Sequence, residues 1–211
     1  MENDFRQYVL YYYNRAAKNY DFGEFIRKGT RPKVVQKSGI QPGGKVLDAC
    51  TGTGELALAF AQAGAKTIGI DIADEMLCRA VEKTCDLPAT WLNMDATNLK
   101  FSDHSFDVST ISLALHHMPE ETQVQVLSEL ARVTLHKVII VEPHQPLNPK
   151  LHWLWRIVAD IIDESEYISQ WVKQDFNQTC QKAGLEIESV EITTLAIHRI
   201  TVCKPVKSQG L

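Results

Sequence analysis

Short apolar, β-rich runs alternate with segments of helical periodicity over most of this chain. Turn residues bound each run, and the sequence Gln-Pro-Gly-Gly at 41–44 introduces the first. Because such an order builds βαβ units, it predicts a largely parallel sheet with helices on both of its faces. We expect strands at residues 45–49, 67–72, 91–94, 106–115 and 137–142, and helices at 55–63, at 73–83 and after 119.

The end of the chain follows a different pattern. A short helix is expected at residues 175–183, ended by Gly184, and two strand-like runs follow at 185–192 and 196–203. These runs are close enough in sequence to pair antiparallel, so a hairpin is expected to complete the sheet. The whole layout is typical of a Rossmann-like α/β fold.

A length of 211 residues is typical of a single domain. Residues 41–143 form the expected cofactor-binding core, and residues 174–204 form the last helix and the strand hairpin. Residues 1–40 and 144–173 lie outside the alternation. Because open α/β sheets bind ligands at the carboxyl ends of their strands, we expect 1–40 to be a helical lid and 144–173 to be a cap insertion over that site.

The charge balance argues against nucleic acid as a partner. Lys and Arg number 22 against 26 Asp and Glu, which gives a net charge of -4 and leaves no overall basic field to hold a phosphate backbone. No apolar run approaches the ~20 residues of a transmembrane helix, and the acidic start of the chain is unlike a secretory signal. The sequence therefore predicts a cytoplasmic protein.

Residue types that bind metals are scattered along the chain. The 5 cysteines are odd in number and form no Cys-x-x-Cys pair, which favours reduced thiols over a disulfide framework or a zinc site. His116, His117, Glu142 and His144 are suitable metal ligands by type. Their arrangement in the sequence nevertheless does not indicate a metal site, and we expect none.

A glycine-bearing turn, Gly52-Thr53-Gly54, follows the first strand and opens the first helix. Glycine lets a ligand approach the backbone closely there, and the N–H groups of the helix start point into the site. Residues 52–57 also fit the Gly-x-Gly-x-x-Ala form of a dinucleotide fingerprint, so an NAD-dependent oxidoreductase is an alternative. Asp48 disfavours it, because its charge would face a pyrophosphate, and favours a ligand with an amino or sulfonium group.

Two more carboxylates follow the next two expected strands. Asp71 ends the second strand, where it can accept hydrogen bonds from both hydroxyls of a ribose. Asp95 follows the third strand, where it can accept a hydrogen bond from the exocyclic amine of adenine. Any one of these acids alone is equally consistent with a helix cap or a solvated loop. Together, Asp48, Asp71 and Asp95 form a line at one sheet edge that predicts an adenosine-containing ligand.

An ordered set of motifs resembles that of the class I S-adenosylmethionine-dependent methyltransferases. It comprises Leu-Asp-Ala-Cys-Thr-Gly-Thr-Gly at 47–54 and the segments 70–71, 94–96, 106–108, 115–117 and 141–143. The resemblance covers about residues 8–204 and implies a seven-stranded sheet whose last strand is antiparallel. It also implies S-adenosylmethionine as cofactor, with Asp71 on the ribose, Asp95 on the adenine and the glycine turn beneath the methionine part. The expected cofactor-binding residues are Tyr20, Asp48, Ala49, Gly52, Thr53, Gly54, Asp71, Ile72, Met76, Asp95, Ala96 and Leu113.

Residues 13–21 and 47–56 are also similar to the ubiquinone and menaquinone C-methyltransferases. That family has an Arg-Asn pair after the fourth strand, where this chain has His116-His117, as in many general small-molecule methyltransferases. Many superfamily members have glycine where this chain has Cys50. The resemblance therefore indicates the cofactor and leaves the acceptor open.

Aromatic and histidine residues are candidates for the rest of the site. Tyr20 resembles a tyrosine that closes over the cofactor, and packing of the N-terminal helix is an equal alternative. His117 is either a general base or substrate orienter, or a helix-entry residue bonded to the backbone. The expected residues of the substrate cap are Tyr12, His144 and Trp155.

These features predict an enzyme that transfers a methyl group from S-adenosylmethionine to a small aromatic or lipophilic acceptor, at oxygen, nitrogen or carbon. Its main task is to align the acceptor atom, methyl group and sulfur, with His117 removing a proton where the acceptor requires it. An NAD-dependent oxidoreductase and a non-catalytic S-adenosylmethionine-binding scaffold subunit are the alternatives. The expected partner is the small-molecule acceptor, and the sequence does not define an oligomeric state.

Overall fold

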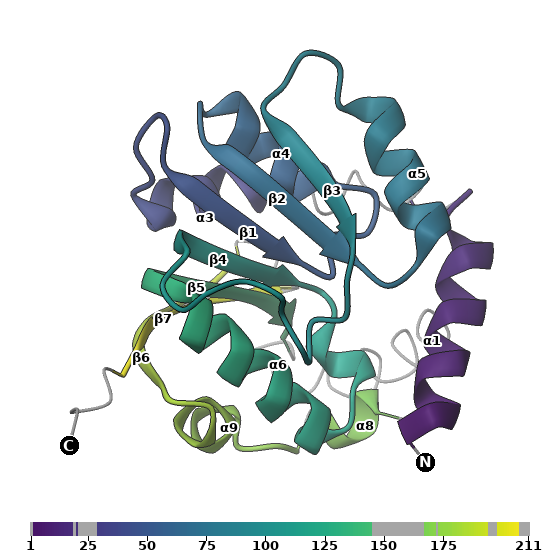
Figure 1. Ribbon diagram of the computed structural model, residues 1–211. Coiled ribbons are helices and arrows are strands. Elements are labelled where there is room, and N and C mark those ends of the chain that lie inside the picture. The colour runs from purple at the N-terminus through teal and green to yellow at the C-terminus, as the bar shows by residue number, and fades with distance from the viewer. Residues whose placement is uncertain are drawn as a thin grey trace.

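The computed structural model describes residues 2–18, 20, 29–144, 167–171, 173–193 and 198–206. Within these residues the strands form a seven-stranded sheet in the order β3-β2-β1-β4-β5-β7-β6 (Figure 1). Neighbouring strands from β3 to β5 are parallel, and β7 is antiparallel to both β5 and β6. The predicted fold class is thereby confirmed. The strands are β1 (Lys45–Ala49), β2 (Lys66–Asp71), β3 (Ala89–Asn93), β4 (Phe106–Ser112), β5 (Thr134–Pro143), β6 (Leu185–Ile192) and β7 (His198–Pro205).

Helices cover both faces of the sheet. The helices α3, α4 and α5 pack on one face, and α6 and α9 pack on the other (Figure 1). The middle of strand β5, residues 138–141, is continuously apolar because it is buried on both faces: Val138 and Ile140 join the core under α6, while Ile139 and Val141 join the core under α4. The helical elements are α1 (Glu2–Ala16), α3 (Arg31–Ser38), α4 (Glu55–Gln62), α5 (Asp74–Lys83), the 3-10 turn η2 (Leu115–His117), α6 (Glu120–Val133), α8 (Ile168–Trp171) and α9 (Phe176–Lys182).

Most predicted strands and helices lie within a few residues of their observed positions, and one boundary differs in an informative way. The strand expected at 106–115 ends at Ser112, so its last residues were assigned wrongly. Leu113 adopts a left-handed backbone with φ 56°, which an L-residue rarely takes inside a strand. The chain then forms η2, and this turn carries His117 away from the sheet.

Helix α1 stands at the edge of the sheet where β1, β2, β3 and β4 end (Figure 1). It packs against α5, where the side-chain carbonyl of Asn14 accepts a hydrogen bond from the Glu75 amide at 3.1 Å. Ala17, Ala73 and Met76 form a small buried cluster at the same contact. The N-terminal helix therefore covers the carboxyl ends of the strands, which is the position expected for a lid.

The insertion expected to form a cap is described only in part. Its residues 145–166 and 172 lie outside the described residues, and Trp155 is among them. The described helix α8 is attached to the core, because Trp171 is buried and its indole N–H donates to the carbonyl of Pro143 at 3.3 Å. None of the described helices is both long enough and apolar enough to cross a bilayer.

Candidate active site

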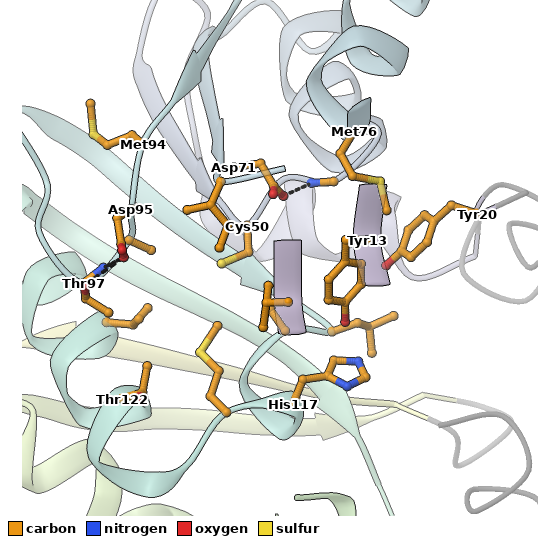
Figure 2. A pocket seen from close by; sticks show the side chains of 18 residues that line it. Tyr13, Tyr20, Cys50, Asp71, Met76, Met94, Asp95, Thr97, His117 and Thr122 are labelled. Carbon is orange, nitrogen blue, oxygen red and sulfur yellow. Dashed lines mark hydrogen bonds between the residues drawn. The ribbon is translucent and has the colours of Figure 1, made fainter. Parts of the chain in front are cut away.

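A cavity of about 530 Å³ opens at the carboxyl edge of the sheet, between α1, the glycine turn and η2. This volume is typical of a site for a small organic ligand. Figure 2 shows Tyr13, Tyr20 and His117 at one end of the cavity, which we name the aromatic end. It shows Asp95, Thr97 and Thr122 at the other, which we name the polar end, with Asp71 and Cys50 between the two.

The structure brings most of the predicted site residues to this cavity. A smaller cavity of about 70 Å³ adjoins it and shares Tyr20, Cys50, Gly52 and Leu113 with it. Asp48 and Thr53 line the smaller cavity. The predicted residues that line the larger cavity are Tyr20, Gly52, Asp71, Ile72, Met76, Asp95, Ala96, Leu113 and His117.

Four described residues of the predicted set line neither cavity. Ala49 is fully buried in the core under α6. Tyr12 lies beside the site and packs its ring edge-on against Tyr13, with the ring centroids 5.2 Å apart. His144 follows β5 outside both cavities, and burial, together with the charge of Arg199, lowers its pKa. The fourth is Gly54.

Gly54 is required for packing. It has φ 82°, and a Cβ atom there would lie 2.5 Å from a ring carbon of Trp91 and 2.9 Å from the Cβ of Ala80. The Trp91 indole N–H donates to the Thr84 hydroxyl at 2.7 Å, which holds the ring in this place. This glycine therefore lets α4 begin close to β3 and α5.

Other lining residues were not anticipated from the sequence. Val9 and Tyr13 come from α1 and are four residues apart, so they share one face of the helix. Thr122 and Val126 stand in the same relation on α6. The four-residue spacing is the sequence signal that could have identified these two pairs, but many other pairs share it, so it is informative only once the cavity is known. The remaining unanticipated residues are Cys50, Met94, Thr97, Ala114 and Met118.

Asp71 links the glycine turn to the start of α5. One carboxylate oxygen accepts the Gly52 amide at 2.8 Å, and the other accepts the Ala73 amide at 2.9 Å. Burial raises the pKa of Asp71, and these backbone hydrogen bonds partly oppose the rise. The carboxylate is thus fixed at the end of β2, where further lone pairs of its oxygens remain as acceptors toward the cavity.

Asp95 and Asp48 flank this position. One oxygen of Asp95 accepts both the amide and the hydroxyl of Thr97, at 2.9 and 2.7 Å, which shapes the loop after β3 (Figure 2). Asp48 accepts hydroxyl hydrogen bonds from Thr51 and Thr110, both at 2.6 Å. Burial raises the pKa of Asp48 to about 6, against the effect of these two bonds.

The lining of the larger cavity has an acidic balance. Among the described residues that line it, Asp71 and Asp95 are carboxylates, and no lysine or arginine is present. Such a site favours a ligand that carries positive charge and hydrogen-bond donors over one that carries phosphates. Asp71 and Asp95 therefore lie at one cavity on the sheet edge, and Asp48 lies at the adjoining smaller cavity.

Cys50 has a backbone conformation that favours glycine. Its φ of 51° lies in the left-handed region, where a side chain costs about 1–2 kcal/mol. Burial raises the pKa of the thiol, and the charges of Asp71, Asp48 and Asp95 add to the rise. The thiol is therefore protonated near neutral pH and is a poor nucleophile.

His117 lies at the aromatic end, on the turn after β4. Its ring centroid is 5.8 Å from that of Tyr13 in an edge-on contact, and 3.9 Å from that of His116. His116 is buried and lines neither cavity. In the part of the chain that the structure describes, no group of three or more His, Cys, Asp or Glu side chains is arranged to hold a metal ion.

Comparison with known proteins identifies the family of this chain. A family model described as a methyltransferase domain matches residues 46–136. The ubiquinone/menaquinone biosynthesis C-methyltransferase UbiE of Bdellovibrio bacteriovorus is 38% identical over 142 residues, which are 62% of this chain and 59% of that protein. This match spans less than two thirds of the relative's length.

Two further proteins extend the comparison. The demethylmenaquinone methyltransferase of Lactobacillus johnsonii is 32% identical over 219 residues and covers 88% of this chain and 89% of that protein. The magnesium protoporphyrin IX methyltransferase of Synechocystis PCC 6803, solved with bound SAH, has a TM-score of 0.67 at 24% identity, over 84% of this chain and 82% of that chain. The fold is therefore shared with a protein that binds SAH, the demethylated product of S-adenosylmethionine. The chain belongs to the class I S-adenosylmethionine-dependent methyltransferases.

Proposed function

We propose that the protein transfers the methyl group of S-adenosylmethionine to a small aromatic or lipophilic acceptor, with the two substrates bound in the cavity at the carboxyl edge of the sheet. One observation carries this proposal. Asp71 and Asp95, at neighbouring strand ends, line a single cavity whose described lining contains no lysine or arginine. Hydrogen-bond acceptors for a nucleoside and an environment suited to a sulfonium are thereby combined in one place.

S-adenosylmethionine fits this lining, because different residues suit its adenosine end and its amino-acid end. In this proposal Asp71, which lines the cavity, accepts hydrogen bonds from the ribose hydroxyls, and Asp95 accepts one from the adenine amine. Ile72, Ala96 and Leu113 supply apolar surface for the base and sugar. The smaller cavity, with Asp48, Gly52 and Thr53, is suited to the amino-acid end of the molecule.

The aromatic end is the proposed acceptor site. When bound, S-adenosylmethionine supplies a methyl group on a sulfonium, which leaves as a neutral thioether. Tyr13 and Tyr20 offer flat apolar surface to an aromatic acceptor at that end. His117 is the polar group on the same wall, and we propose that it accepts the proton of a hydroxyl or of an activated ring carbon.

The similarity to quinone methyltransferases indicates which acceptor to test first. UbiE-type and demethylmenaquinone methyltransferases act in quinone biosynthesis by name. An aromatic ring with an apolar substituent fits the lining of Val9, Tyr13 and Tyr20. We therefore propose an alkyl-substituted 1,4-naphthoquinol as the first acceptor, alongside simple phenols and amines.

Calorimetry tests the cofactor proposal. The protein is expected to bind S-adenosylmethionine and its demethylated product more tightly than NAD. Asp71→Asn retains one oxygen acceptor for the turn and should weaken S-adenosylmethionine binding by about 1.5–3 kcal/mol, or roughly 10- to 150-fold. Asp86→Asn, which changes an exposed carboxylate in the turn before β3, is the matched control. Equal affinities for NAD and S-adenosylmethionine, or an unchanged Asp71→Asn variant, would contradict the proposal.

Turnover separates an enzyme from a cofactor-binding scaffold. A panel of phenols, amines and the naphthoquinol is incubated with S-adenosylmethionine, and each product is examined by mass spectrometry for an added methyl group. The proposal expects methylation of an aromatic or lipophilic member of the panel. Tight cofactor binding without turnover on any of these acceptors would favour the scaffold.

A further inference from the structure

Glu142, near the end of β5, has both carboxylate oxygens bound by a single turn. It is 1% exposed. Its Oε1 accepts the amides of Ala114 and Leu115 at 3.1 and 2.8 Å, and its Oε2 lies 2.6 Å from Nδ1 of His116. All three partners lie at or beside η2, so one buried charge holds the segment that follows β4.

That segment places two adjacent histidines in different environments. His116 is directed to Glu142 and is 6% exposed, whereas His117 lines the cavity. The His117 amide donates to the Ala114 carbonyl at 3.2 Å, which closes the turn. The two imidazole rings lie 3.9 Å apart with a tilt of 39°, so the His116 ring forms one wall of the space that the His117 ring occupies.

We propose that Glu142 and His116 are positioning residues that hold the His117 imidazole at the acceptor end of the cavity. This inference rests on the proposed function. In that reaction the acceptor atom bonds to the methyl carbon, the carbon–sulfur bond breaks to leave a thioether, and the acceptor proton passes to the His117 ring. The turn fixes the ring on the cavity wall, and the buried carboxylate favours the positive charge that the ring then carries.

Other groups near the turn also act on the His117 ring, so the test must separate their effects from that of Glu142. Across the antiparallel pair, Arg199 of β7 lies opposite Glu142 and opposes part of its charge. Tyr13 of α1 contacts the His117 ring edge-on, and Asp71 and Asp95 line the same cavity. A substitution that removes the charge of Glu142 and keeps the shape of its side chain isolates the effect of that charge on His117.

Two variants divide the positioning into charge and ring contact. Glu142→Gln keeps an oxygen for the two amides and removes the charge. His116→Asn keeps a nitrogen donor near the position of Nδ1 and removes the ring. Glu186→Gln on β6, whose carboxylate is mostly exposed at a distance from the site, is the matched control. Circular dichroism and urea unfolding establish that each variant folds.

Long-range ¹H–¹⁵N spectra of protein labelled at histidine nitrogens provide a readout that needs no acceptor. His117→Ala assigns the His117 signals. In Glu142→Gln we expect these signals to titrate at a pH lower by about half a unit or more, because a nearby negative charge favours the imidazolium. In His116→Asn we expect a changed tautomer ratio or line broadening for His117. Unchanged His117 signals in both variants would overturn the inference.

Kinetics with the alkyl-substituted naphthoquinol, or with whichever panel member is methylated, give the second readout. Glu142→Gln should lower kcat about 10- to 100-fold with the KM for S-adenosylmethionine within about twofold, and should add little to the loss in His117→Ala. Fully additive losses would show that Glu142 acts independently of His117. Failure of the wild-type protein to bind S-adenosylmethionine would instead refute the proposed function itself, whatever the spectra show.

Discussion

Replacing Asp48 by Asn is expected to stabilise the protein at neutral and alkaline pH. The carboxylate is 2% exposed, and burial raises its pKa from the ordinary 3.8 to about 6. A rise of this size means that ionisation of the folded protein costs about 3 kcal/mol more than ionisation of the unfolded chain. Asparagine avoids that cost and keeps both hydroxyl contacts, since its oxygen can accept from one of Thr51 and Thr110 while its amide donates to the other.

The expected gain depends on pH in a defined direction. Because the folded pKa of Asp48 is above the unfolded value, the unfolded chain loses this proton first as the pH rises. The wild-type penalty is therefore absent below about pH 4, grows between about pH 4 and 6, and is constant above that range. The free energy of unfolding of Asp48→Asn should exceed that of the wild type by about 1.5 kcal/mol at about pH 5 and by about 3 kcal/mol at about pH 8.

Urea unfolding followed by circular dichroism at both pH values measures this difference. Asp86→Asn, at an exposed position, controls for the loss of one negative charge. The reasoning is refuted if Asp48→Asn is no more stable than the wild type at about pH 8, or if its advantage is the same at both pH values. The variant should bind S-adenosylmethionine more weakly, because a buried carboxylate that destabilises the fold is expected to be retained in a binding site for its interaction with the ligand.

Three other substitutions are expected to change the stability of the protein through local effects. Arg132→Lys should lower the free energy of unfolding by about 1–2 kcal/mol in urea, because lysine cannot reproduce the guanidinium contacts to Glu129 and to the carbonyls of the loop after β3; an unchanged midpoint would contradict this. Gly54→Ala should lower the Tm by several degrees in calorimetry, since its Cβ would overlap the ring of Trp91, and a wild-type Tm would show that the ring moves freely. Cys50→Gly should be more stable than Cys50→Ala by about 1 kcal/mol, because only glycine accepts φ 51° without strain, and equal unfolding midpoints would count against that strain.

The fold could be predicted because its signal is local and repeated. The central parallel strands contain short runs of buried apolar residues, such as residues 138–141 of β5, and each helix between strands has one apolar face. The end of β4 could not be placed, because residues 113–115 are as apolar as the strand before them. The strand ends where Leu113 takes a left-handed backbone, and the turn that follows is held by Glu142, which lies 27 residues beyond Leu115 in the chain and accepts its amide.

Most residues predicted to bind the cofactor line one of the two cavities, and the exceptions have a geometric cause. Asp71 and Asp95 follow strands, so chain order alone places them at one sheet edge. Ala49 was grouped with Asp48, but successive side chains of a strand point to opposite faces, and only Asp48 faces a cavity. Gly54 was grouped with Gly52, but its missing side chain makes room for a tryptophan from another strand.

The proposed acceptor end is built from parts that no single motif contains. Val9 and Tyr13 come from one face of α1, and His117 comes from a turn held by a carboxylate of another strand. These residues meet only after the sheet has formed and α1 has packed on α5. If the proposed roles hold, changes in α1 and η2 alter the acceptor while Asp71 and the glycine turn stay fixed. On this reasoning, acceptor specificity in such a chain is set by the helix face that covers the strand ends, and cofactor specificity by the strand ends themselves.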